Sequence, residues 1–334
     1  MNAVSKLLTA SALGLLLTAC GGSSGGESFT IGNGKPPAPD PGVVSIGFSD
    51  APVDDVKEVT IEVDTITFRK SGEDDVVVDT FTIPELNLVD AETFQINLLA
   101  YQGSSQLLVI KDIELEDGEY SDIILDILDE DSEKSYVLEL DDERKIIKVP
   151  SDTLKLGSFE VTGEETQTFT LEFNLRESLV YKPGPDEYNL KPRGIRIQNN
   201  SDDSSLSGNV DSSLFDTETD CATKPDPLKG NVLYLYEGHE LTVANLVDTY
   251  DPDEAEDLPA NAIAPYTSVV VGNDGAYTFA FLPEGDYTLV FSCNAAEDDP
   301  EEYDELELPL PEEQIVELTL SAGSDLSYNL PVPE

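Results

Sequence analysis

Hydrophobic and polar residues alternate along most of the chain. Phenylalanine and leucine alternate with polar residues over 169–175, aliphatic residues with aspartates over 122–127, and aromatic residues with small ones over 277–281. A period of two predicts β-strands with one buried face and one face in water. Residues 90–103 predict at most two helical turns, and no segment has a convincing helical period. Many short strands between turn residues predict an all-β fold with two β-sandwich domains in tandem.

Two details of this pattern predict particular features. Residues 59–63 alternate in one phase and residues 66–68 in the other, which predicts a β-bulge near residues 64–65. Residues 272–281 and 282–293 are two alternating segments, each with a glycine turn, and they predict a paired hairpin.

The N-terminal segment predicts a membrane anchor. Residues 7–17 form an apolar stretch after one lysine. It is shorter than the roughly 20 residues that cross a bilayer, and it predicts a secretory signal. Residues 17–20 resemble the bacterial lipobox, which implies that residues 1–19 are a lipoprotein signal peptide and that Cys20 carries the lipid, palmitate included. The glycine after Cys20 implies, by the same resemblance, the outer membrane of a Gram-negative bacterium. The alternative is an ordinary signal peptide with a chance cysteine.

Composition separates the anchor from the folded part. Glycine, serine and proline dominate residues 20–42, which predicts a flexible linker. The alternating patterns then fill two segments, and we predict one domain over residues 43–200 and a second over residues 205–334. The linker would hold both domains away from the lipid surface.

The charge limits the possible partners. The chain has 69 acidic and 18 basic residues, for a formal net charge of -51. Nucleic acid is excluded as a partner, because phosphate binding needs basic patches. An anionic bilayer repels such a chain, so we expect the lipid alone to hold it at the membrane. Cations, basic proteins and neutral glycans remain candidates, and the simplest interpretation of the charge is a solvated acidic surface.

Short motifs in the first predicted domain carry a family resemblance. They lie at residues 49–52, 118–120 and 188–192. In these motifs the domain resembles DUF4382, a domain of unknown function found in bacterial lipoproteins and their archaeal relatives. The resemblance covers residues 43–198 and implies no activity and no catalytic residues. Asp50 follows a predicted strand over 44–48, and we expect its carboxylate to accept backbone N–H groups in an Asx turn rather than to act in catalysis.

The second predicted domain has turn motifs of another kind. They lie at residues 208–210, 273–277 and 282–287. Here the chain resembles carboxypeptidase-regulatory-like and CnaB-like domains, β-sandwiches related to transthyretin and to carbohydrate-binding folds. The acidic insert over 248–257 departs from that pattern, and we expect a loop there. Cys221 and Cys293 also lie in this domain, and an even pair in an oxidising compartment predicts a disulfide.

The residues that catalysis needs are scarce. His239 is the one histidine of the chain, and no nucleophile elbow, phosphate-binding loop or dinucleotide fingerprint is present. One histidine and two paired cysteines leave too few zinc ligands. The sequence therefore predicts a protein that is not an enzyme. A hydrolase that uses two carboxylates stays open as an alternative, because such residues abound.

Acidic clusters make calcium the one candidate cofactor. The candidate ligands are Asp251, Asp253, Glu254, Asp257, Asp298 and Asp299, with a further run at Asp129, Asp131 and Glu133. Calcium takes 6 to 8 oxygen ligands, but none of these runs has EF-hand spacing. A solvated charged loop is the simpler interpretation of each run.

Together these patterns predict a non-catalytic, lipid-anchored protein of the cell envelope with a binding or structural role. Its ligand would be a glycan or a protein. Glycan binding rests on the fold resemblance alone, and a row of exposed tyrosines and phenylalanines on one face would favour it. The alternatives are a calcium-dependent adhesion or assembly module and a carboxylate-based hydrolase.

Overall fold

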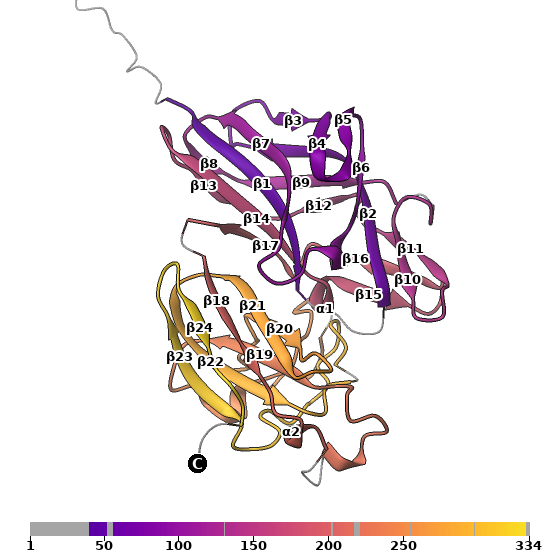
Figure 1. Cartoon of the computed structure of the whole chain (residues 1–334), viewed down its shortest axis with the longest axis vertical. Helices are drawn as coiled ribbons and strands as arrows, with labels where there is room; N and C mark the ends of the chain where they lie inside the picture. Colours follow the sequence, from indigo (N-terminus) through magenta and orange to yellow (C-terminus); the bar gives the residue numbers. More distant parts are fainter. Residues whose placement is uncertain are drawn as a thin grey trace, which may run out of the picture. The chain divides into compact units, whose positions relative to one another are not determined.

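The computed structural model describes residues 40–51, 56–129, 131–201, 203–216, 221–253, 255–296 and 298–331 (Figure 1). Strands dominate these residues, which confirms the predicted all-β fold. Helices are limited to single short turns, and among the described residues none is long and apolar enough to cross a membrane. We call residues 40–201 the N-terminal region and residues 203–331 the C-terminal region. Both lie within one compact unit, Pro39–Glu334.

A four-stranded sheet forms one layer of the N-terminal region. Its order is β17 (Ile195–Asn199), β14 (Thr166–Asn174), β1 (Gly42–Ala51) and β7 (Leu107–Leu115). β1 runs parallel to β14 and antiparallel to β7. Alternate residues of β1, namely Val44, Ile46 and Phe48, are completely buried, as expected for a strand with one face on the core.

A larger sheet provides the second layer. Its path is β12-β9-β2-β10-β11-β16-β15, and β3 and β6 also pair with β2. Its strands are β2 (Val56–Arg69), β3 (Val76–Val78), β6 (Phe94–Asn97), β9 (Asp122–Ile127), β10 (Tyr136–Glu139), β11 (Arg144–Lys148), β12 (Thr153–Lys155), β15 (Leu179–Lys182) and β16 (Glu187–Leu190). The pairing of β2 with β9 shifts between Val63 and Thr65, which confirms the predicted bulge. One hydrophobic core lies between the strands of this region.

Smaller elements complete the N-terminal region. β4 (Phe81–Ile83) pairs with β5 (Leu88–Ala91), and β8 (Gly118–Tyr120) pairs with β13 (Phe159–Val161). The helical turns are η1 (Pro84–Leu86), η2 (Leu98–Ala100) and α1 (Leu175–Ser178). η2 is a single turn, which agrees with the limit predicted for residues 90–103.

The C-terminal region has two sheets of its own. One has the order β21 (Ala276–Leu282), β18 (Ser204–Asn209) and β24 (Asp325–Ser327). The other has the order β20 (Thr267–Val270), β19 (Val232–Glu237), β22 (Gly285–Ser292) and β23 (Ile315–Leu320). Short turns are α2 (Ser213–Asp216), η3 (Cys221–Thr223) and η4 (Val243–Asn245). Leucine, phenylalanine and tyrosine side chains from both sheets form a shared core.

The predicted hairpin over residues 272–293 is wrong. β21 and β22 follow each other in the sequence, but β21 pairs with β18 while β22 pairs with β19 and β23. The turn between them therefore crosses from one sheet to the other. The alternation had identified both strands correctly, but a period of two does not identify a strand's partner.

Candidate functional site

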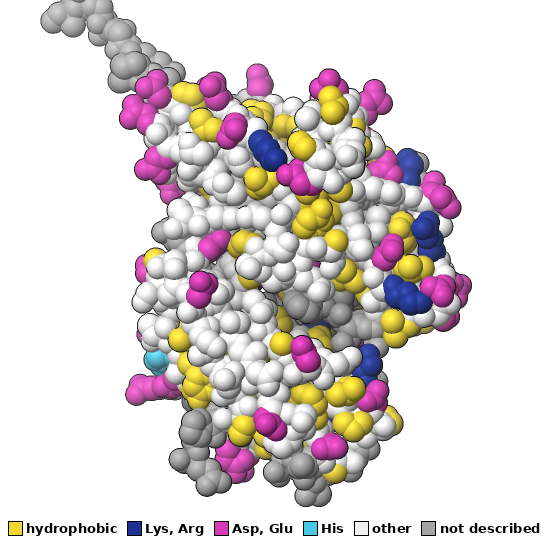
Figure 2. Space-filling model, viewed as in Figure 1, with side chains coloured by type: hydrophobic (Ala, Val, Ile, Leu, Met, Phe, Trp, Pro, Cys, Tyr) yellow, Lys and Arg dark blue, Asp and Glu magenta, His cyan; other side chains and the backbone are white. Residues whose placement is uncertain are grey.

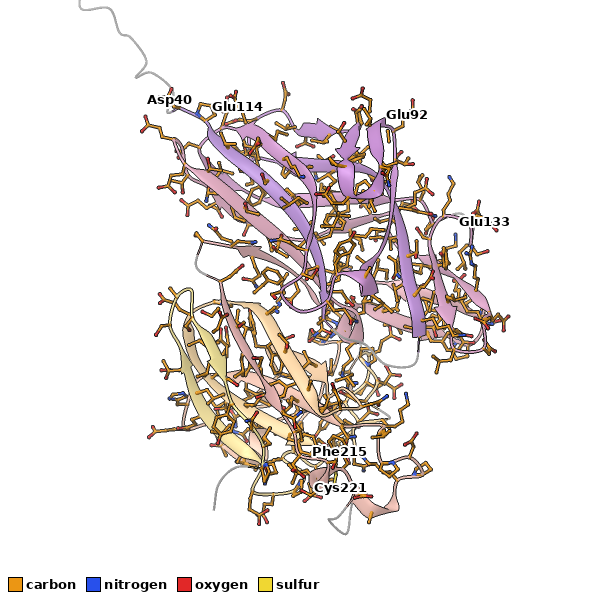
Figure 3. All side chains as sticks on the ribbon, in the orientation of Figure 1. Asp40, Glu92, Glu114, Glu133, Phe215 and Cys221 are labelled. Atoms are coloured by element: carbon orange, nitrogen blue, oxygen red, sulfur yellow. A yellow bond between two sulfur atoms is a disulfide. The ribbon has the colours of Figure 1, made fainter. Side chains whose placement is uncertain are left out.

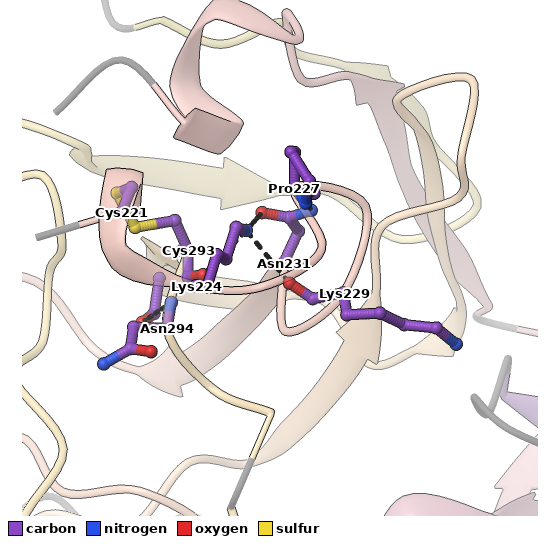
Figure 4. Close-up of a disulfide and its surroundings, with 8 residues drawn as sticks. Cys221, Lys224, Pro227, Lys229, Asn231, Cys293 and Asn294 are labelled. Carbon is purple, nitrogen blue, oxygen red and sulfur yellow. Dashed lines mark hydrogen bonds between the residues drawn. A yellow bond between two sulfur atoms is a disulfide. The ribbon is translucent and has the colours of Figure 1, made fainter.

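The predicted disulfide is confirmed. Cys221 in η3 and Cys293 just after β22 are bonded, with their Cα atoms 5.7 Å apart and both side chains fully buried (Figure 4). The Lys224 ammonium donates hydrogen bonds to the Cys293 carbonyl at 2.9 Å and to Asn231 Oδ1 at 2.6 Å. The disulfide and the hydrogen bonds of Lys224 together hold the segment after α2 against the end of β22.

Acidic loops of the C-terminal region bind basic side chains of the N-terminal region. Arg176 in α1 forms an ion pair with Asp298, and their side chains are 12% and 0% exposed. The Tyr234 hydroxyl donates to the same Asp298 carboxylate at 2.6 Å. The Thr249 backbone N–H also donates to Asp298 Oδ1 at 3.3 Å, so the buried carboxylate has three donors.

A second set of contacts lies beside this pair. Lys191 donates to Asp251 at 3.1 Å and also to Glu301, which in turn pairs with Lys182. Arg193 donates to the carbonyl of Tyr250 at 3.0 Å and to that of Pro300. We call these residues the charged junction: Arg176, Lys182, Lys191, Arg193, Asp251, Asp298 and Glu301. Residues of two acidic runs, 251–257 and 297–304, thus form ion pairs with the chain's few lysine and arginine side chains, although the sequence suggests solvated loops.

The candidate calcium ligands therefore lie in different environments. Asp251 and Asp298 are paired with Lys191 and Arg176, as described above. Asp299 accepts the backbone N–H of Glu301 at 2.8 Å, while Asp253 and Asp257 are exposed. Glu254 lies outside the described residues.

Another acidic group comes closest to a cation site. Glu139, Asp141 and Glu143 at the β10–β11 turn have carboxylate oxygens within 4.8 Å of one another. No other set of this kind was found in the part of the chain that the structure describes. Calcium binding stays a prediction. Many other acidic side chains point outward, as Glu92, Glu114 and Glu133 do in Figure 3, and acidic side chains are spread over the face in Figure 2.

Buried carboxyl groups surround α1. Asp50 was expected in a turn, but β1 continues to Ala51, so Asp50 lies inside a strand and is 1% exposed. Its Oδ2 accepts from Gln102 at 3.5 Å, and residues 52–55, which an Asx turn would include, lie outside the described residues. Burial raises the pKa of Asp50 well above its usual value. Burial also raises the pKa of Glu177 to about 7, although three arginines nearby oppose the shift.

Unsatisfied polar atoms gather at the same place. Among the described residues, the buried side-chain nitrogen and oxygen atoms without a hydrogen-bond partner belong to Asp50, Arg176, Arg193, Arg196, Thr249 and Ser268. Arg196 pairs with Glu172 and stacks over the Tyr266 ring at 4.6 Å, so it also bridges the two regions. Native proteins leave few such atoms unpaired, so the two junction arginines among them, Arg176 and Arg193, set this place apart.

A cleft of about 430 Å³ opens beside the charged junction. We call it the junction cleft. Its lining consists of Val149, Pro150, Ser151, Thr153, Lys155, Lys191, Pro192, Arg193, Asp251, Pro252 and Asp253. Apolar proline rings and both signs of charge therefore face one space. A second cleft, about 450 Å³ in volume, lies between Gln102, Gly103 and residues 270–278 and carries Asp274 as its acidic group.

The geometry gives little support to catalysis by His239 or to glycan binding. His239 Nε2 lies 3.0 Å from the Leu318 carbonyl oxygen and 3.8 Å from Asp286, rather than beside a serine or cysteine nucleophile. Tyr181 is the one aromatic side chain among the exposed large hydrophobic residues that the structure describes, and its hydroxyl donates to Asp186 at 2.6 Å. A row of exposed rings, which would favour glycans, is not found in the described residues.

Comparisons with known proteins support the first resemblance. Residues 41–192 match the family model described as "Domain of unknown function (DUF4382)". No curated protein matches the chain. The match stops before the C-terminal region, so the CnaB-like character of that region stays a prediction.

Several solved structures are similar to the chain at low identity. The Bacillus anthracis TIE protein is 11% identical, with 86% of this chain and 33% of that chain covered and a TM-score of 0.19. This chain thus spans about a third of that protein. The minor pilin GBS52 of Streptococcus agalactiae is 13% identical, with 87% and 98% covered and a TM-score of 0.18. A putative adhesin from Bacteroides ovatus is 7% identical, with 87% and 94% covered and a TM-score of 0.18. Such TM-scores do not establish a common fold or role.

Proposed function

We propose that the chain is a non-catalytic binding protein of the bacterial cell envelope and that the junction cleft binds a segment of a partner protein. We further propose that a lipid on Cys20 anchors it in the outer membrane. The observation that carries the binding role is the junction cleft itself, a mixed apolar and charged hollow between two regions. Ligand sites in proteins occur preferentially at such interfaces.

The walls of the cleft support recognition rather than catalysis. Lys191 and Asp251 are bound to each other, and Arg193 donates to three backbone carbonyls, so these side chains are held in place. A catalytic acid or base needs contact with the substrate, but these groups already have protein partners. The carboxyl groups with raised pKa values, such as Asp50 and Glu177, do not line the cleft.

A protein ligand suits this lining better than a sugar does. Sugars favour an exposed aromatic platform, whereas the lining contains proline, valine, serine and threonine side chains and no aromatic ring. Prolines offer apolar contact without a backbone donor. Lys155, one of the lining residues, is exposed and adds a positive charge to a strongly acidic chain.

The binding role can be tested by photocrosslinking in living cells. A photoreactive amino acid at Ser151 in the cleft is compared with one at Leu228, an exposed position in the C-terminal region. We expect a discrete crosslinked product from Ser151 alone, and we expect Pro192→Arg to remove it by filling the cleft. Equal crosslinking at both positions, or none at Ser151, would exclude the cleft as the binding site.

The anchor needs a separate experiment. Wild type and Cys20→Ser are labelled with a lipid precursor, and the membranes are then fractionated. We expect label and outer-membrane location for the wild type only. Equal partition of the two proteins would rule out an anchor on Cys20.

A further inference from the structure

β12 leaves a free sheet edge beside the junction cleft. It is the last strand of the larger sheet, and within the described residues it pairs on one side only, with β9. The Leu156 N–H donates to the Ile123 carbonyl, so the backbone groups of Leu154, two residues earlier, also point toward β9. Those of Thr153 and Lys155 point away from the sheet, and both residues line the cleft. An extended chain can add to such an edge through backbone hydrogen bonds.

Lys155 is the basic residue of this edge, and it has no partner in the described part of the chain. Every other lysine and arginine described there has one, in an ion pair, a hydrogen bond, a ring contact or another electrostatic interaction. The chain has 69 acidic residues for 18 basic ones, so acidic partners are abundant. The exposed Lys155 ammonium is therefore the described cation that is free to meet a carboxylate from another chain.

The lining of the cleft limits the side chains of an added strand. Thr153 and Lys155 share one face of β12, and the completely buried Leu154 lies on the other. A carboxylate opposite Lys155 forms a favourable cross-strand pair, whereas a basic residue there is repelled. The exposed Asp253 also lines the cleft and repels further carboxylates. A strand with one acidic residue between apolar neighbours therefore suits the cleft, where Pro192 offers apolar contact.

We propose that the partner segment adds as an extended strand to the free edge of β12 and places one carboxylate beside Lys155. The inference rests on the proposed function and specifies the conformation and the charge of the segment that the junction cleft binds. A second copy of the chain is disfavoured as the occupant, because two chains that each carry a charge of -51 repel each other. A short peptide also loses conformational freedom when it is ordered along the edge, which limits its affinity.

Peptide titration with residue-resolved hydrogen exchange tests this arrangement. The protein is the chain from residue 20 onward with Cys20→Ser, in about 0.15 M NaCl to screen long-range repulsion. The probe is the acetylated and amidated peptide Thr-Val-Glu-Val-Thr. We expect it to slow the exchange of the Thr153 and Lys155 amides along a saturating curve. The same peptide with lysine in place of glutamate should bind about tenfold more weakly, equivalent to about 1.4 kcal/mol.

A third peptide separates strand addition from simple charge attraction. It keeps the glutamate but carries a methyl group on the glutamate backbone nitrogen, which removes a donor to the edge. We expect this peptide to leave the exchange of both amides unchanged. Slower exchange with the methylated peptide, equal to that with the probe, would overturn strand addition.

The protein variants test the role of Lys155. Lys155→Met should bind the glutamate and lysine peptides equally, whereas Lys57→Met changes the net charge by the same amount in the same sheet and should keep the tenfold preference. Equal affinity for both peptides in the starting protein, or exchange of the two amides that no peptide slows, would overturn the inference. The crosslinking test at Ser151 would still decide the proposed function, because it does not depend on how the segment binds.

Discussion

The ion pair between Arg176 and Asp298 offers a sharp test of what holds the charged junction together. Asp298 is 0% exposed and accepts hydrogen bonds from Arg176 and from the Tyr234 hydroxyl. We consider Asp298→Asn, Arg176→Met and the double variant. Asparagine keeps an oxygen for the tyrosine but removes the charge, while methionine keeps much of the volume of the arginine stem.

The burial of the pair determines the expected magnitude. Removing one partner leaves the other charge buried without compensation, which costs about 3–5 kcal/mol. Each single variant should therefore lose about that much free energy of unfolding, with Asp298→Asn at the lower end. The double variant removes both charges, so its loss should be no larger than about that of the worse single variant. The two substitutions are then strongly non-additive.

Urea unfolding of the soluble chain measures these differences through the transition midpoint. Lys57 and Asp142 provide the matched control, because they form an ion pair at 2.6 Å whose side chains are 37% and 80% exposed. Lys57→Met should cost no more than about 1 kcal/mol. Single variants as mild as this control, or a double variant equal to the sum of the singles, would refute the account of the junction as a desolvated ion pair.

Three further predictions concern stability. Cys221→Ser with Cys293→Ser should lower the free energy of unfolding by about 4 kcal/mol, because the bridge closes a loop of 72 residues; an unchanged urea midpoint would contradict this. Glu177 has a pKa raised from 4.5 to about 7, so the protonated side chain adds to the free energy of unfolding below pH 4.5. This contribution is lost as the pH rises to 7. At 1.36 kcal/mol per pKa unit, this rise corresponds to about 3 kcal/mol of unfolding free energy. Glu177→Gln should remove the dependence of stability on pH over this range. NaCl should raise the melting midpoint by screening the charge of -51. A midpoint that rises and saturates with CaCl2 at fixed ionic strength would instead support the calcium alternative. That rise should be absent in Asp251→Asn/Asp253→Asn.

Local patterns in the sequence predicted much of the fold. Alternation located the strands, and the phase shift after Val63 located the bulge, because both depend on neighbouring residues. The disulfide could be predicted because only two cysteines remained to pair. Strand partners could not be predicted in the same way, and the crossing between β21 and β22 shows why. Each segment determines which face is apolar, but its partner depends on how the whole sheet closes.

The candidate site was harder to predict for a related reason. Arg176 and Asp298 are 122 residues apart, and nothing near either residue identifies the other. Acidic runs such as residues 251–257 have the composition of solvated loops, and only the fold brings lysine and arginine side chains to them. Asp50 is a similar case, since its burial follows from the continuation of β1 past Phe48. One sequence feature could have indicated the site. Basic residues are few in this chain, and three of them, Lys191, Arg193 and Arg196, lie close together.

The central place of β1 has a mechanical consequence. Its nine residues from Val43 to Ala51 are in register with β14 on one side, and β7 covers the other side. A pulling force applied at Gly42 acts along this strand. The hydrogen bonds on both sides then resist together in shear instead of opening one after another. Resistance to such a load is governed by the rate of unfolding rather than by equilibrium stability, so β1 is well placed to bear tension applied at its start.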